Sequence, residues 1–238
     1  MFTLALVGAD GAGKTTIGKR LADQSDLQVK YVYMGVNLES SHLMLPTTRL
    51  VLEIKRLRGG RPDMAGPPDP NRPKSPPKGF IRRIWVELKA LLRLAVYLPE
   101  EWFRQGVVWY YRRQGNLVIL DRDFLLDYYF HDVIPTTGYR TISRHIHGWI
   151  LRNFYPRPDL IIYLDAPAEV LFARKGEGTL EMLESRRQEY LKLEGIVGSD
   201  FAKVDATQSE DQVTSEVTQI ILEFHRKKSS TSPGVGPL

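Results

Sequence analysis

The chain has 238 residues, a formal net charge of +5 at pH 7 and no cysteine. This length suits one α/β domain with or without an insertion, and the lack of cysteine excludes disulfides and thiolate metal sites. The positive charge favours an anionic partner such as a nucleotide, a nucleic acid or an anionic lipid surface.

Five short apolar runs are predicted to be strands. In chain order they occupy residues 3–8, 29–35, 117–120, 160–166 and 201–206. Such runs are typical of parallel strands buried on both faces, and the helical patterns between them indicate a doubly wound sheet.

Helices are expected at residues 15–24, at 81–95, from about 100 to 113 and at 211–227. Between residues 81 and 95 the apolar side chains recur at helical spacing, which predicts an amphipathic helix. Pro99 should break or restart that helix, because proline lacks the backbone donor that a helix interior uses.

Two segments are rich in proline, glycine or serine and poor in apolar side chains. They are residues 59–79, interpreted as a flexible insertion, and residues 228–238, interpreted as a disordered tail. A single domain is therefore expected over residues 1–227. The apolar start is short and lacks a positive leader region, so it predicts a strand rather than a signal peptide, and a cytoplasmic location is expected.

The first predicted strand runs into the pattern G-x-x-x-x-G-K-[ST], carried by Gly8, Gly13, Lys14 and Thr15. The glycines let backbone N–H groups curl around a phosphate, at the positive end of the next helix. Lys14 would add a charge on the phosphates, and the Thr15 hydroxyl would bind Mg²⁺. The residues expected to bind ATP are Gly8, Ala9, Asp10, Gly11, Ala12, Gly13, Lys14, Thr15 and Thr16.

A second site element, "LDRD", ends the strand predicted at 117–120. Asp121 is the candidate carboxylate for organising Mg²⁺, and the alternative is a strand-terminal Asp that caps a turn. Arg122 could bind an acceptor phosphate, or it could be a surface arginine paired with Asp123. No resident metal site is expected from His131, His145 and His147, because residues two apart on a helix do not share a face.

Four segments together resemble the thymidylate kinase family of nucleoside monophosphate kinases: residues 8–16, 120–123, 158–176 and 204–213. The resemblance implies a P-loop kinase fold in three layers, with a five-stranded parallel sheet flanked by helices. It implies transfer of a phosphoryl group from ATP with Mg²⁺ to a nucleoside monophosphate, with thymidine monophosphate converted to the diphosphate. It also suggests a homodimer.

The same resemblance implies roles for individual residues. Asp10 and Arg122 would contact the acceptor, and a lid segment at about residues 174–193 would close over the phosphates. The lid arginines would be Arg174, Arg186 and Arg187, with Arg174 preferred, since the other two could equally lie on an exposed helix face. The residues expected to act in catalysis are Lys14, Asp121, Arg122 and Arg174.

The chain departs from the family pattern in four places on the acceptor side: Val7, residues 33–41, residues 97–105, and the pair Phe130–His131. Two alternatives therefore stay open. One is a kinase of the same fold acting on a sugar or glycan hydroxyl, with Asp10 or Asp123 as general base. The other is a non-catalytic nucleotide-binding regulator whose basic, aromatic helices contact a membrane. Nucleic-acid binding is not expected, because no recognition motif appears.

Overall fold

The computed structural model describes residues 1–24, 28–39, 41, 43–60, 75–134, 139–196, 198 and 200–231. Five strands form one sheet: β1 (Thr3–Val7), β2 (Val29–Tyr33), β3 (Leu117–Asp121), β4 (Leu160–Asp165) and β5 (Asp200–Asp205). All neighbouring strands are parallel, in the order β2-β3-β1-β4-β5. The expected five-stranded parallel sheet is confirmed.

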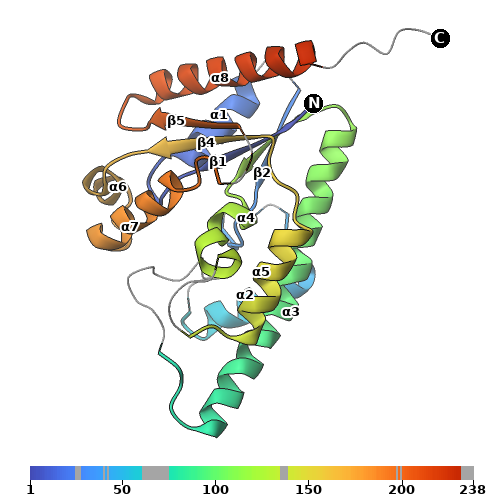
Figure 1. Cartoon of the computed structure of the whole chain (residues 1–238), viewed down its shortest axis with the longest axis vertical. Helices are drawn as coiled ribbons and strands as arrows, with labels where there is room; N and C mark the ends of the chain where they lie inside the picture. The colour runs from blue at the N-terminus through green and yellow to red at the C-terminus, as the bar shows by residue number, and fades with distance from the viewer. Residues whose placement is uncertain are drawn as a thin grey trace, which may run out of the picture.

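The helices of the described chain alternate with these strands. They are α1 (Lys14–Gln24), α2 (Pro46–Leu57), α3 (Phe80–Arg113), α4 (Phe124–Asp127), the π-helical turn η1 (Tyr129–Val133), α5 (Ile142–Asn153), α6 (Ala168–Lys175), α7 (Leu180–Leu191) and α8 (Glu210–Thr231). Figure 1 shows α1 and α8 on one face of the sheet and α3 and α5 on the other. The result is the three-layer α/β arrangement expected from the sequence.

Side chains of the central strands alternate between two hydrophobic cores. On β1, Leu4 and Leu6 join the core under α1 and α8, whereas Ala5 and Val7 join the core under α3 and α5. Both sets are fully buried, and residues 4–7 of the strand are accordingly all apolar instead of alternating with polar residues. The edge strands β2 and β5 are partly exposed, which explains their weaker apolar patterns.

The topology places the loops after β1 and β3 side by side. β1 is the middle strand, paired with β3 on one side and β4 on the other. Because parallel strands end at the same edge, the segments that follow β1, β3 and β4 meet there, which is where ligands bind in open α/β sheets.

The helix α3 corrects one expectation, because it continues through Pro99 without a break. One proline removes a single backbone hydrogen bond, and the flanking turns are held by the buried side chains of Tyr97, Glu100 and Arg104. The apolar side chains in the first half of α3 do not cover the sheet. Ile81 and Trp85 are 72% and 66% exposed.

The end of the chain is also more regular than expected. Helix α8 extends to residue 231, so residues 228–231 continue the helix that was expected to end at 227. The rest of the tail, 232–238, and residues 61–74 of the insertion lie outside the described residues. Within the described part of the chain, no helix is long and apolar enough to cross a membrane.

Candidate functional site

The loop between β1 and α1 needs glycine at two positions because it packs directly on neighbouring backbone. Gly8 and Gly11 have φ angles of 151° and 92°, which side-chain-bearing residues rarely adopt. A Cβ on Gly8 would lie 2.7 Å from the carbonyl oxygen of Leu164, and one on Gly11 would lie 2.6 Å from that of Leu171. The loop is therefore seated against the end of β4 and against α6.

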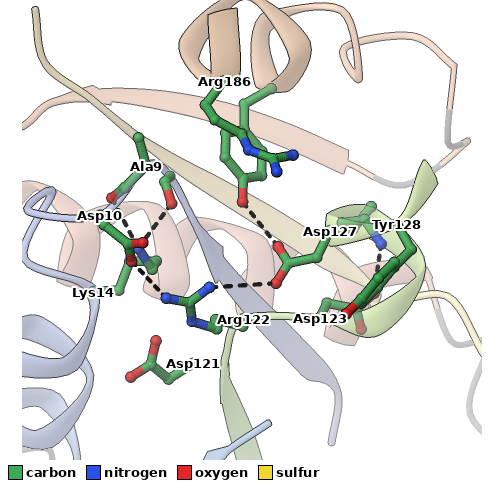
Figure 2. Close-up of polar contacts among 12 residues, drawn as sticks. Ala9, Asp10, Lys14, Asp121, Arg122, Asp123, Asp127, Tyr128 and Arg186 are labelled. Carbon is green, nitrogen blue, oxygen red and sulfur yellow. Dashed lines mark hydrogen bonds and ion pairs between the residues drawn. The ribbon is translucent and has the colours of Figure 1, made fainter. Parts of the chain in front are cut away.

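Lys14 sits inside the curl of this loop. Its ammonium group donates hydrogen bonds to the carbonyl oxygens of Gly8 (2.8 Å) and Ala9 (2.9 Å). Figure 2 shows Lys14 beside Ala9 and Asp10. Burial, together with the nearby charge of Arg122, lowers the pKa of Lys14. The loop thus holds one cation beside the amino end of α1, where an anionic phosphate is favoured.

Thr15 and Asp121 meet across the loops after β1 and β3. The Thr15 hydroxyl donates to Oδ2 of Asp121 over 2.6 Å, and the Tyr31 hydroxyl donates to the same oxygen over 2.6 Å. The other oxygen, Oδ1, is buried and has no hydrogen-bond partner among the described residues. A hydroxyl beside a carboxylate with an unsatisfied oxygen fits the hard oxygen ligands that Mg²⁺ prefers.

Arg122 bridges two carboxylates at the end of β3. Its guanidinium lies 2.5 Å from Asp10 and 3.8 Å from Asp127, and Figure 2 shows it between the two side chains. Its φ of 74° makes it the only non-glycine residue with a positive φ among those described. Strained backbone of this kind gathers at functional sites, where the surroundings hold it in place.

The charges around Asp10 determine its protonation. Burial alone would raise its pKa, but Arg122, Lys14 and Lys175 together hold the pKa of this carboxyl far below its ordinary value. Asp10 is therefore ionised throughout the neutral range. It links the loop after β1 to Arg122 on the loop after β3.

Asp123 does not face the loop after β1. Its side chain accepts a hydrogen bond from the backbone N–H of Leu126 over 3.1 Å and so caps α4. Burial raises the pKa of Asp123 to about 7. That pKa would suit a general base, but the side chain is only 1% exposed and already caps the helix.

Lys175, which the sequence-based interpretation missed, is a cation of the predicted lid segment that contacts the loop after β1. It ends α6 and lies 3.7 Å from Asp10 and 3.1 Å from Glu177. Arg174, the preferred lid arginine, is exposed and makes no hydrogen bond or ion pair within the described chain. Adjacent helical residues point about 100° apart, and in the described chain it is Lys175 whose side chain reaches the loop.

The two arginines of α7 hold side chains of neighbouring elements. Arg187 binds both carboxylate oxygens of Asp165, at 2.6 and 3.1 Å, at the end of β4. Arg186 lies 2.8 Å from Nε2 of His131 on η1 and 3.0 Å from Glu189. Arg187 is thus fixed beside the sheet, whereas Arg186 connects α7 to the segment that departs from the family pattern.

Other contacts in this region were also missed by sequence reasoning. The Tyr190 hydroxyl donates to Asp127 over 2.9 Å, which joins α7 to α4. Arg104 is buried in the segment 97–105, where it binds Glu100 and the backbone oxygen of Tyr33. The spacing of Asp123 and Asp127 around one helical turn could have indicated Asp127. The four-residue spacing of Glu100 and Arg104 in a predicted helix could have indicated their ion pair. Nothing local in the sequence indicates that Tyr190 contacts Asp127 or that Arg104 contacts Tyr33.

The structure therefore brings most of the predicted residues to one edge of the sheet. Those gathered around the loop after β1 are Gly8, Ala9, Asp10, Gly11, Ala12, Gly13, Lys14, Thr15, Asp121 and Arg122. Thr16 is exposed on α1, and Arg174 lies outside this cluster. Across the described residues, no group of three or more histidines and carboxylates is arranged to hold a metal ion.

Comparison with known proteins identifies relatives over most of the chain. No family model matches the sequence. A probable thymidylate kinase of Staphylothermus marinus is 30% identical over 235 residues, covering 93% of this chain and 95% of that protein. A probable thymidylate kinase of Pyrococcus horikoshii is 25% identical over 230 residues, covering 92% and 95%.

A shorter match is probable thymidylate kinase 1 of Saccharolobus solfataricus, which is 30% identical over 117 residues. That match covers 46% of this chain and 56% of the relative. The names of the three relatives support a nucleotide kinase, in agreement with the sheet order and the lysine-bearing loop. At 30% identity along nearly its whole length to one of these relatives, the chain belongs to the thymidylate kinase family.

Proposed function

We propose that this chain transfers the γ-phosphoryl group of ATP to a nucleoside monophosphate, with thymidine monophosphate as the acceptor. The observation that supports this most directly is the meeting of Lys14, Arg122 and the Thr15–Asp121 pair at one edge of the sheet. Transfer between two phosphates needs positioning and neutralisation of charge and little acid–base chemistry. A cluster of cations and metal-ligand oxygens provides both.

The residues divide this work among them. Backbone N–H groups of the loop and the ammonium of Lys14 would hold the triphosphate. Thr15 and Asp121 would hold Mg²⁺, which when bound neutralises charge on the phosphates. Arg122 would bind the acceptor phosphate by exchanging one of its carboxylate partners, Asp10 or Asp127, for phosphate oxygens.

Lys175 would supply the cation that the sequence-based interpretation gave to Arg174. Its position beside Asp10 places an ammonium group next to the loop that would carry the donor phosphates. A cation there would stabilise charge that develops on the transferring group. Arg186 would support the acceptor side through His131.

The charges at the site favour a phosphate acceptor over a sugar hydroxyl. A hydroxyl acceptor calls for a general base with a pKa near neutrality. The cations around Asp10 hold its pKa far too low for that role, and Asp123 is buried as a helix cap. Neither candidate base is suited to a hydroxyl, whereas Arg122 is suited to a phosphate.

The test is an ADP-release assay with Mg²⁺ and ATP across a panel of acceptors. The panel contains the common nucleoside monophosphates, the matching nucleosides, several sugars and a blank. We expect turnover with monophosphates only, fastest with thymidine monophosphate. Turnover with a sugar but with no monophosphate would contradict the proposal, as would the absence of acceptor-stimulated turnover.

A further inference from the structure

The side chain of Tyr31 reaches the proposed metal site from the edge strand of the sheet. Its hydroxyl donates to Oδ2 of Asp121 over 2.6 Å, the oxygen that also accepts from Thr15 over 2.6 Å. Asp121 is fully buried, and its Oδ1 has no partner within the described residues. Two donors therefore bind one oxygen of the carboxylate, and the other oxygen has no hydrogen-bond partner in the described chain.

Helix α1 is shaped to admit this tyrosine. A Cβ on Gly18 would lie 2.8 Å from Cε2 and 3.0 Å from Cδ2 of the Tyr31 ring. Glycine in a helix interior is destabilising relative to alanine, so its presence here calls for a packing reason. The ring of Tyr31 occupies the space that a side chain at position 18 would fill.

We propose that Tyr31 is a positioning residue for the metal site, an inference that rests on the proposed kinase function. By donating to Oδ2, its hydroxyl fixes the rotation of the Asp121 carboxylate and leaves Oδ1 for the coordination shell of Mg²⁺. Ligand groups held by outer hydrogen bonds bind metals more tightly than unsupported ones. The phenol provides this support from β2, a strand that carries none of the residues predicted for catalysis.

The experiment compares ATP binding with and without Mg²⁺ by calorimetry, using a non-hydrolysable ATP analogue. Tyr31→Phe keeps the ring and removes only the hydroxyl. In EDTA we expect the variant to bind the analogue as the wild type does. The gain in affinity on adding Mg²⁺ should be about tenfold smaller than in the wild type, because one hydrogen bond to a charged group is lost. Gly18→Ala, which displaces the ring, should reproduce this loss. Tyr110→Phe, on the exposed face of α3, is the matched control.

A Tyr31→Phe protein with the wild-type gain from Mg²⁺ would overturn the inference, even if its melting temperature fell, because that result marks a purely structural contact. A wild-type protein that gains no affinity from Mg²⁺ would overturn it as well. A wild-type protein that binds Mg²⁺ with the analogue but phosphorylates no nucleotide would contradict the proposed function alone. In that case the difference between wild type and Tyr31→Phe in metal binding still decides the role of Tyr31.

Discussion

The ammonium group of Lys175 lies 3.7 Å from the carboxylate of Asp10, so the end of α6 meets the loop after β1 through one cation. We expect Lys175→Ala to lower kcat by about tenfold to a hundredfold, because it removes a charge from the region where phosphoryl transfer is proposed. The binding of ATP should change much less. Steady-state kinetics with thymidine monophosphate measure both effects.

Arg174→Ala is the matched control for this prediction. The two residues are exposed neighbours on the same helix and carry the same charge, but only Lys175 contacts Asp10 within the described chain. Arg174→Ala should therefore stay within about twofold of wild type, as is usual for exposed substitutions without a specific contact. A larger loss of kcat in Arg174→Ala than in Lys175→Ala would restore the interpretation based on sequence.

Lys14 should matter far more for turnover than for folding. Its ammonium group contacts two carbonyl oxygens of the loop, and no carboxylate lies within ion-pair distance in the described chain. Lys14→Ala should lower kcat/KM by at least about a hundredfold, since it removes a charge that would contact the phosphates. Lys19→Ala, exposed on the same helix, should have no effect. Near-normal turnover by Lys14→Ala would show that the nucleotide binds elsewhere.

Asp10→Asn separates a phosphate acceptor from a hydroxyl acceptor. Because Arg122, Lys14 and Lys175 hold the pKa of Asp10 low, this carboxylate should not titrate between about pH 5 and pH 9. We expect the variant to raise KM for the acceptor, through the lost contact to Arg122, and to leave the shape of the kcat profile against pH unchanged. If turnover disappears and a titration near neutrality is lost with it, Asp10 acts as a base.

His147 should make the stability of the protein depend on pH. It is buried between Glu101 on α3 and Asp132 on η1, with ring nitrogens 3.0 and 2.7 Å from their carboxylates. Burial alone would lower its pKa, but these hydrogen bonds and charges raise the pKa of His147 from 6.5 to about 9. Protonated His147 therefore adds on the order of 3 kcal/mol to the free energy of unfolding. This contribution is complete below pH 6.5 and is lost as the pH rises through 9.

Urea unfolding at a series of pH values measures this effect. The free energy of unfolding should fall between pH 6.5 and pH 9 in the wild type and fall much less in His147→Gln, which is less stable at low pH. His145→Gln, exposed on the same helix, should keep the wild-type slope. Equal slopes in wild type and His147→Gln would contradict the raised pKa.

The local part of the site could be predicted from the sequence, because backbone geometry determines it. The glycines, Lys14 and Thr15 follow a buried strand and open a helix, and that order alone places them at the carboxyl edge of a parallel sheet. Asp121 was predictable for the same reason. The residue types at the end of one strand are enough to indicate a phosphate site.

The other contacts depend on how distant elements pack, which local patterns do not contain. Whether Arg174 or Lys175 faces the loop depends on the rotation of α6 against the sheet. The partner of Tyr31 lies on β3, 90 residues away in sequence. The helix-capping role of Asp123 could have been predicted from the sequence, because an aspartate directly before "FLL" is a typical helix cap. Pro99 was misread because tertiary packing can retain a helix through a proline.

The central position of β1 in the sheet affects how the chain can fold while it is being synthesised. β1 leaves the ribosome before β3 and β4, but Thr3 pairs with Val118 on β3, and its backbone binds Asp159 just before β4. One edge of β1 therefore stays unpaired until β3 has been synthesised, and the other edge until β4 has been synthesised. Fragments that stop before β4 should aggregate rather than fold, and slow translation upstream of β4 should make expression depend on chaperones.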